Sequence, residues 1–217
     1  EFVDLFINKI QKLKIGNGLD EGVQLGPLTT EKRLNEVEKL VEKTKKLRIG
    51  DGMDPSTQLG PLTTKKRLNE IEELVEKTKQ EGAKVLLGGK RPAGFNKGFF
   101  YEPTVFDNVK DDFTIMKQEP FGPLVPMLSF KSFDEVIERA NNHELGLSSY
   151  ICTNSMEKAH KASELMETGT VAVNTPLVAI AEAPFGGIKQ AGYGREGGSM
   201  AIKDYLNVKY THLGLKG

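Results

Sequence analysis

Residues 12–45 and 46–79 are two copies of one segment, and this repetition limits what the chain can fold into more than any other feature. The copies are identical at 25 of their 34 positions, and each runs from a KLKIG or KLRIG sequence through QLGPLTT into a helical pattern. The matches include charged side chains that such a helix exposes, for example Lys32 and Lys66. Diverged structural repeats keep mainly their apolar positions. The sequence therefore indicates a duplicated piece of a larger fold.

A period of 34 residues is also typical of tetratricopeptide arrays, which bind partner proteins. Such arrays need two helices in each unit and at least three units to close a core. Each unit here offers one helix and one loop rich in glycine and proline. The pattern favours a duplicated piece, and a helical interaction module built on residues 12–79 remains the alternative.

The duplicated helices have the same apolar stripe. It consists of Leu34, Val37, Leu40, Val41 and Thr44 in the first copy, and of Leu68, Ile71, Leu74 and Val75 in the second. When the KLKIG and KLRIG sequences are superposed, the first copy's stripe also falls on the apolar positions of a helix predicted over residues 1–13. We expect one copy to take the native position and the other to pack on or near the surface, with exchange between them. Pro55, which replaces Glu21, restricts the second loop and favours the second copy.

Composition excludes several classes of protein. Lys plus Arg and Asp plus Glu both total 30, so no net field attracts nucleic acid or an anionic membrane. No apolar run reaches the roughly 18 residues of a membrane span. The single cysteine excludes an internal disulfide and is typical of a reducing cytoplasm. The three histidines lack metal-ligand spacing, so we expect no metal site.

Strands and helices alternate from Ala83 onward. Strands are predicted at AKVLLGG, FFYEPTVFDNV, LVPMLSF, LSSYICT and GTVAVN, and helices at SFDEVIERANN and SMEKAHKASELME. This order predicts an α/β fold, with a parallel sheet covered by helices, as a single domain portion over residues 1–217. The end of the chain reads as a short helix followed by an alternating strand without a partner, and we expect it to pair with another domain or subunit.

Two motifs point to chemistry. In KQEPFGPLVPM, three prolines stiffen the backbone around Glu119 and Phe121, so a carboxylate and an aromatic ring are held with little freedom. A plain turn that leads into a strand would have the same pattern. APFGGIKQAGYGREGG matches no phosphate-binding glycine motif, and its glycines are interpreted as permitting positive φ in a long loop. Cys152, in SSYICTNS, has no adjacent basic residue and is interpreted as a buried structural thiol.

EPFGPL, GTVAVN, APFGGIKQAGYGRE and IKDYLNVKY, in this order and spacing, resemble the C-terminal part of the NAD(P)-dependent aldehyde dehydrogenase superfamily. KLKIGNGLDEGVQLGPL is similar to the family sequence that follows the nucleophile motif, and KYTHLGL is most similar to the succinate-semialdehyde dehydrogenase branch. The resemblance covers the whole chain apart from one extra copy of the repeated segment. It implies an α/β catalytic-domain portion and an oligomerisation strand, in a homo-oligomer, within residues 205–217.

The resemblance also implies a reaction, in which a cysteine thiolate attacks an aldehyde and hydride passes to NAD or NADP before a glutamate activates water. By position in the motifs, Glu119 is similar to the carboxylate that holds the nicotinamide ribose and Phe121 to the aromatic residue beside the nicotinamide. Phe185 is similar to an aromatic residue that lines the aldehyde tunnel.

The family's nucleophile motif G-Q-x-C, its general-base motif E-L-G-G and its Rossmann domain are not in this sequence. We therefore predict no catalytic residue here and a fragment that is inactive alone. The alternative is a non-catalytic association module that complements a missing N-terminal half or docks on a full-length subunit. Semialdehyde enzymes place a hydroxyl in the segment PLVAIAEAP, where Ala179 and Ile180 are apolar, which counts against succinate semialdehyde as substrate.

Overall fold

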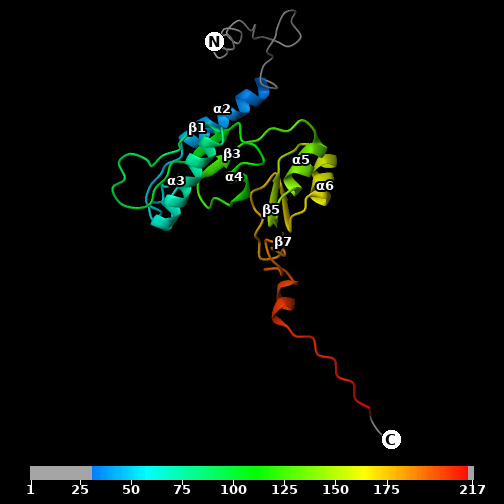
Figure 1. Ribbon diagram of the computed structural model, residues 1–217. Coiled ribbons are helices and arrows are strands. Elements are labelled where there is room, and N and C mark those ends of the chain that lie inside the picture. The colour runs from blue at the N-terminus through cyan, green and yellow to red at the C-terminus, as the bar shows by residue number, and fades with distance from the viewer. Residues whose placement is uncertain (1–30, 215–217) are drawn as a thin grey trace, which may run out of the picture. The chain divides into compact units, whose positions relative to one another are not determined.

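The computed structural model describes residues 31–214, with side chains from residue 35 onward. The helix predicted over residues 1–13 and the side chain of Leu34 lie outside the described part of the chain. The chain divides into two compact units, one ending at Leu128 and the other beginning at Ser129. Figure 1 labels the helices and strands of both units.

The first unit is built around a three-stranded sheet. The strands stand in the order β1-β2-β3, with β1 antiparallel to β2 and β2 parallel to β3. Phe106 and Val105 of β2 point to opposite faces, because side chains alternate along a strand. The elements of this unit are α2 (Glu31–Lys45), α3 (Lys65–Gln80), β1 (Lys84–Leu87), β2 (Thr104–Asp107), α4 (Thr114–Lys117) and β3 (Leu124–Pro126).

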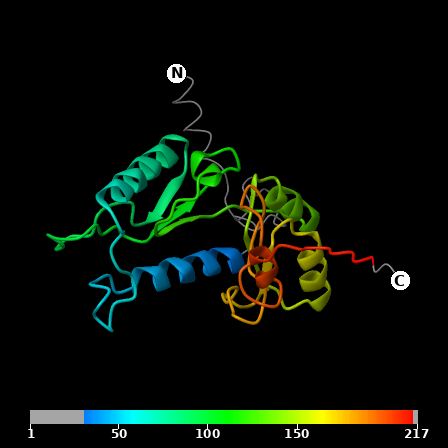
Figure 2. The same cartoon turned by 90° about the horizontal axis from the view of Figure 1, so that it is seen from below.

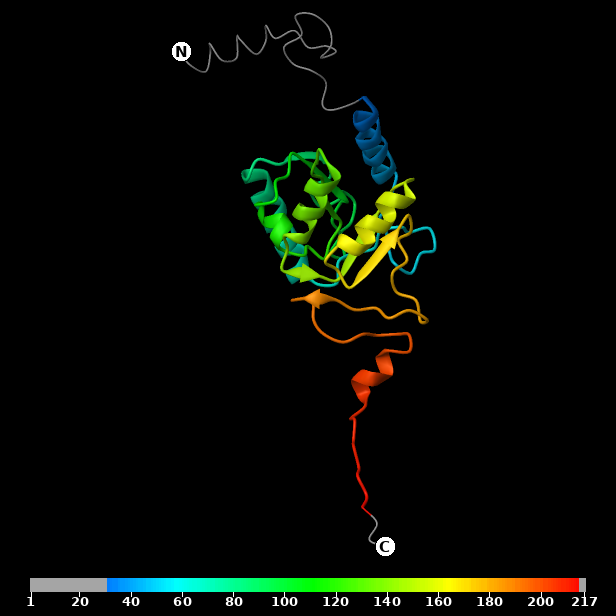
Figure 3. The ribbon, with the colours of Figure 1, turned by 90° about the vertical axis from the view of Figure 1, so that its right-hand side faces the viewer.

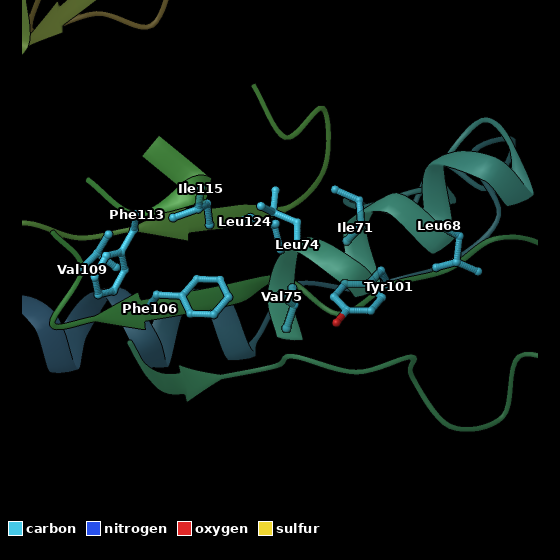
Figure 4. Packing of buried hydrophobic residues seen from close by; sticks show 10 residues of the cluster. All are labelled: Leu68, Ile71, Leu74, Val75, Tyr101, Phe106, Val109, Phe113, Ile115 and Leu124. Atoms are coloured by element: carbon cyan, nitrogen blue, oxygen red, sulfur yellow. The ribbon is translucent and has the colours of Figure 1, made fainter. Parts of the chain in front are cut away.

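Helix α3 covers one face of this sheet. Its start is capped by Thr64, whose side-chain oxygen accepts a hydrogen bond from the Arg67 N–H at 3.1 Å. The apolar stripe of α3 packs in one core cluster with Phe106 of β2 (Figure 4). The buried side chains of the helix are Leu68, Ile71, Leu74, Val75 and Thr78. The Thr78 hydroxyl donates to the Leu74 carbonyl at 2.7 Å, so this buried polar group is satisfied.

Helix α2 has nearly the same sequence but is much less buried. Among its described side chains only Val37, Val41 and Thr44 are half-buried, and Leu40 is 38% exposed. The helix contacts β1 and lies on the opposite side of the sheet from α3 (Figure 2). Val105, which points away from α3, is nonetheless fully buried. Helix α2 thus gives the second face of the sheet a thin cover.

The second unit contains two short sheets and two helices. Strands β5 and β6 pair in parallel, and β4 pairs with β7 in antiparallel. Helices α5 and α6 lie on the same side of the β5–β6 pair (Figure 3). Ser132 caps α5 by accepting the Glu135 N–H at 3.1 Å, as its S-x-x-E pattern predicts. The elements are α5 (Phe133–Asn141), β4 (Leu145–Gly146), β5 (Ser148–Ile151), α6 (Met156–Leu165), β6 (Thr170–Val173), β7 (Ile188–Lys189) and a 3₁₀ helix, η1 (Ala201–Tyr205).

The α/β fold predicted from the sequence is confirmed, with two parallel strand pairs, β2–β3 and β5–β6. The described strands nevertheless form three separate sheets instead of one, and β1 pairs in antiparallel because no crossover helix stands between it and β2. Residues 206–214, predicted as a strand, are exposed chain to which the structure assigns no strand. Among the described helices, none has the length and apolar character needed to cross a membrane.

Candidate functional site

The loop of residues 118–123 follows α4, and hydrogen bonds hold α4 to the end of α3. The Glu81 carboxylate, just beyond α3, accepts hydrogen bonds from the Thr114 hydroxyl at 2.6 Å and from the Thr114 N–H at 2.9 Å. These bonds favour the ionised carboxylate and lower the pKa of Glu81. Because they tie α4 to the end of α3, the loop begins with little freedom.

The backbone of this loop lies close against α3. A Cβ added to Gly122 would lie 2.5 Å from Ile71 Cδ1, so only glycine allows this approach without a shift. Phe121 has a φ of 34°, in the left-handed region that aromatic residues rarely adopt. The flanking prolines restrict the rest of the loop. Glu119 and Phe121 are both exposed as a result, Phe121 to 65%.

Arg67 of α3 lies over the ring of Phe121. Its guanidinium carbon is 5.5 Å from the ring centroid, within the range of a cation–π contact. Arg67 also forms an ion pair with Glu70, with 2.9 Å between Nη1 and Oε2. A cavity of about 390 Å³ is lined by these two residues and by Ile71, Leu74, Gln118, Glu119 and Pro120.

Sequence reasoning assigned α3 to packing only, and it missed Arg67 and Glu70. A signal was available, because each of the two directly precedes a residue of the apolar stripe, Leu68 or Ile71. Residues at the edge of an apolar stripe lie next to the surface against which the stripe packs. The site therefore combines a carboxylate that can accept hydroxyl groups, an exposed ring and a guanidinium group.

Phe185 belongs to the second unit and lines a different cavity. Its N–H and carbonyl exchange two hydrogen bonds of 2.7 Å with Glu196, which close the glycine-rich loop. The Arg195 guanidinium donates to the carbonyl of Gly187 at 2.9 Å and to that of Gly194 at 2.6 Å. The cavity has a volume of about 340 Å³, and its side-chain lining includes Leu147, Phe185, Tyr193, Arg195 and Tyr205.

The glycine-rich loop uses its backbone N–H groups internally. The Arg195 N–H donates to the Asp204 carboxylate at 2.9 Å, and the Gly198 N–H to the Ala181 carbonyl at 2.8 Å. Gly194 has a φ of 82°, which agrees with the interpretation that these glycines serve positive φ. The backbone N–H groups of Arg195 and Gly198, like those of the Phe185–Glu196 pair, already donate hydrogen bonds within the protein. They are therefore not available to hold a phosphate group, and the loop does not resemble a phosphate cradle.

Cys152 is exposed, so the prediction of a buried structural thiol is wrong. Strand β5 ends at Ile151, one residue before the cysteine, and strand alternation places Cys152 on the side of Tyr150, which is 58% exposed. The ends of β5 and β6 are joined beyond this point, where the Thr153 N–H donates to Asn174 Oδ1 at 2.9 Å and Asn174 Nδ2 donates back at 2.8 Å. The thiol lines a cavity of about 520 Å³ that α5 and α6 border.

The histidines lie on separate elements. His143 Nδ1 accepts the Leu145 N–H at 2.9 Å, His160 is 3.5 Å from Glu164, and His212 is 3.1 Å from the Tyr210 hydroxyl. Within residues 31–214, no group of three or more His, Cys, Asp or Glu residues could hold a metal ion.

Comparison with known proteins gives the class to which this fold and these loops belong. The sequence pattern that defines the aldehyde dehydrogenase family matches the chain in two stretches, residues 1–45 and 36–211. The chain therefore belongs to the aldehyde dehydrogenase family. The two stretches overlap at residues 36–45, so most of α2 is matched twice.

Individual relatives agree with this class. The mitochondrial succinate-semialdehyde dehydrogenase of Oryza sativa subsp. japonica is 38% identical over 215 residues, which are 99% of this chain and 34% of that protein. The glutarate-semialdehyde dehydrogenase of Pseudomonas putida is 42% identical over 209 residues, 96% of this chain and 36% of that protein. An NAD⁺ complex of an aldehyde dehydrogenase from Bacillus cereus has a TM-score of 0.78 and 43% identity, covering 81% of this chain and 35% of the other. The chain spans about a third of the length of these relatives.

Proposed function

We propose that this chain is the C-terminal part of an NAD(P)-dependent aldehyde dehydrogenase and supplies the nicotinamide end of its cofactor site. The observation that carries the proposal is the loop of residues 118–123. Its backbone is pressed against α3 at Gly122, and it holds an exposed carboxylate and an exposed aromatic ring two residues apart. This loop is the motif at which the family resemblance assigns contacts to the nicotinamide ribose and the nicotinamide.

The residues of the loop fit such a group. Glu119 would accept hydrogen bonds from the ribose hydroxyls, and Phe121 would lie beside the flat nicotinamide ring. Arg67 would keep the Phe121 ring in place through its cation–π contact. Phe185, half-buried and held by two hydrogen bonds to Glu196, would line the aldehyde tunnel. The bound cofactor, NAD or NADP, would supply the hydride acceptor.

On this proposal the chain alone does not oxidise aldehydes, because its sequence lacks the family's nucleophile and general-base motifs. The direct test measures NAD(P)H formation with a panel of aldehydes and both cofactors, beside a Cys152→Ala variant. We expect no signal above that variant. Turnover by the chain that disappears in Cys152→Ala would show that Cys152 is a nucleophile and would contradict the proposal.

A complementation test addresses the cofactor site. The chain is mixed with the N-terminal two thirds of the Bacillus cereus relative, and NAD(P)H formation is measured. We expect turnover that Glu119→Gln lowers at least about tenfold, since one charge-assisted hydrogen bond is worth roughly 1.5 kcal/mol or more. Glu157→Gln on the exposed face of α6 is the control, and an equal loss in both variants would argue against a role for Glu119.

A second candidate function is non-catalytic association, and the exposed tail favours it. Leu206, Val208 and Tyr210 alternate with polar residues and are 62%, 101% and 83% exposed. A row of exposed apolar side chains on extended chain suits pairing with a strand of a second copy. Light scattering should show an oligomer that Val208→Lys dissociates, whereas Lys209→Glu, a change at a neighbouring position of the tail, leaves it intact. A monomeric unaltered chain would contradict this function.

The cellular compartment stays a prediction. Named relatives include mitochondrial and chloroplastic enzymes, so membership of the family does not by itself place the chain in the cytoplasm.

A further inference from the structure

Both stretches of the chain that match the family include residues 36–45 of helix α2. In the match over residues 36–211 it precedes the KLRIG loop, and α3 follows that loop. In the match over residues 1–45 it follows the KLKIG sequence, as α3 follows the similar KLRIG sequence in the other match. The structure shows the first of these arrangements, with α2 against β1 and α3 in the core.

We propose that α2 can also occupy the core position of α3, with residues 46–79 looped out, so that the chain contains a spare copy of its central helix. We call this the alternative arrangement. The proposal does not depend on the function proposed above.

The side chains of α2 match the core position. The five buried residues of α3 are Leu68, Ile71, Leu74, Val75 and Thr78, and their counterparts in α2 are Leu34, Val37, Leu40, Val41 and Thr44. The only change at a buried position is valine for isoleucine, which removes one methylene. Cores tolerate such changes when shape and patterning are kept.

The candidate cofactor loop would find the same neighbours in both arrangements. Arg67, which lies over Phe121, and Glu70, which pairs with Arg67, correspond to Arg33 and Glu36 in the first copy. The alternative arrangement therefore rebuilds this face of the site with the same residue types. It also removes the Ile71 Cδ1 that approaches Gly122.

The observed arrangement is favoured by how the chain continues after each helix. Beyond α3 the chain passes through Glu81, which bonds to Thr114, and enters β1 at Lys84. In the alternative arrangement the second copy must be closed as a loop between α2 and β1, and the cost of loop closure grows only slowly with length. Helix α2 buries little of its own surface in the observed arrangement, because only three of its described side chains are half-buried. We therefore expect the alternative arrangement as a minor state in equilibrium with the observed one.

A charge placed in the α3 stripe tests the proposal in the full chain. Val75 is fully buried, so Val75→Asp excludes α3 from the core. We expect the variant to stay folded by using α2. Hydrogen exchange measured by mass spectrometry should show protection moving from residues 65–80 to residues 31–45. Residues 104–107 of β2 should keep protection within about a hundredfold of the unaltered chain.

Two variants serve as controls. Val41→Asp, the matched change in half-buried α2, should leave the pattern of protection nearly unchanged. The double variant carries a charge in both helices and should lose the protection of β2 completely. Loss of that protection in Val75→Asp alone would overturn the proposal, as would a double variant that stays folded. The proposal would also be overturned if light scattering showed Val75→Asp to be a dimer while β2 keeps its protection from exchange. In that case the α2 that fills the core would come from a second molecule.

Discussion

Helices α2 and α3 have almost the same sequence and bury very different amounts of it. Leu74 of α3 is 7% exposed, while its counterpart in α2, Leu40, is 38% exposed. Val75 is fully buried and Val41 only half-buried. Both segments form helices because local preference depends on the sequence, which they share. The depth of burial depends on the surface that each helix meets, and only α3 meets the face that contains Phe106.

The two helices also differ in the residues that come directly after them. Glu81 after α3 bonds to Thr114, and Gly82, with a φ of 107°, turns the chain toward β1. The counterparts after α2 are Leu47 and Arg48, which can supply neither the carboxylate nor the glycine. A few residues outside the repeat thus decide which copy is anchored.

The largest expected effect concerns matched core truncations. In a chain that carries Val41→Asp, so that α2 cannot serve as a substitute, Leu74→Ala should lower the free energy of unfolding of the first unit by about 2–4 kcal/mol, because it empties a buried position. Leu40→Ala in the same chain should cost less than about 1 kcal/mol. Urea denaturation measures both changes. Equal losses would break the distinction between the two helices.

A smaller effect is expected where the loop of the candidate site touches α3. Gly122→Ala places a methyl group against Ile71 Cδ1 and should cost about 1–3 kcal/mol of unfolding free energy. Ile71→Val, which gives α3 the residue that α2 has, removes that atom and should recover part of the loss. A double-mutant cycle of the two changes checks this, and strict additivity would mean that the contact does not limit the approach.

The anchor after α3 should make stability depend on pH. The Thr114 bonds lower the pKa of Glu81 below its ordinary value of 4.5, so the ionised form is favoured in the folded state. This contribution is fully present above the unfolded-state pKa and is lost as pH falls through the lower folded-state pKa. Thr114→Val should reduce the loss of stability between neutral pH and about pH 3. Denaturation curves at several pH values measure it, and an unchanged pH profile would contradict the role of the anchor.

Much of the local structure could be predicted from the sequence. The apolar stripe of the second copy and the capping pattern around Ser132 identified α3 and α5, because both signals lie within one helix. The position of Glu119 and Phe121 on an exposed loop follows from the prolines around them. These features depend on residues that are close along the chain.

Features that depend on distant residues could not be predicted. The place of Arg67 beside the apolar stripe puts it at the border of the packing surface, but its contact with Phe121 arises only because α3 and the loop after α4 pack together. Cys152 lies two residues beyond the exposed Tyr150, and the exposure of that side depends on what packs against β5. The different burial of the two copies arises in the same way, since identical stripes meet different surfaces.

The smallest expected effect is at the surface ion pair between Glu72 of α3 and Arg91. Arg91 donates to both carboxylate oxygens of Glu72, each at 2.7 Å, and this contact lowers the pKa of Glu72. Both side chains are partly exposed, so water and salt weaken the interaction, and Glu72→Gln should cost about 0.2–1 kcal/mol, less at high salt. Glu38→Gln, the matched change in α2, should cost less, because Arg91 is already paired with Glu72. Urea denaturation at low and high salt measures the difference. A larger loss from Glu38→Gln would mean that Arg91 faces α2, and that the first copy occupies the core in solution.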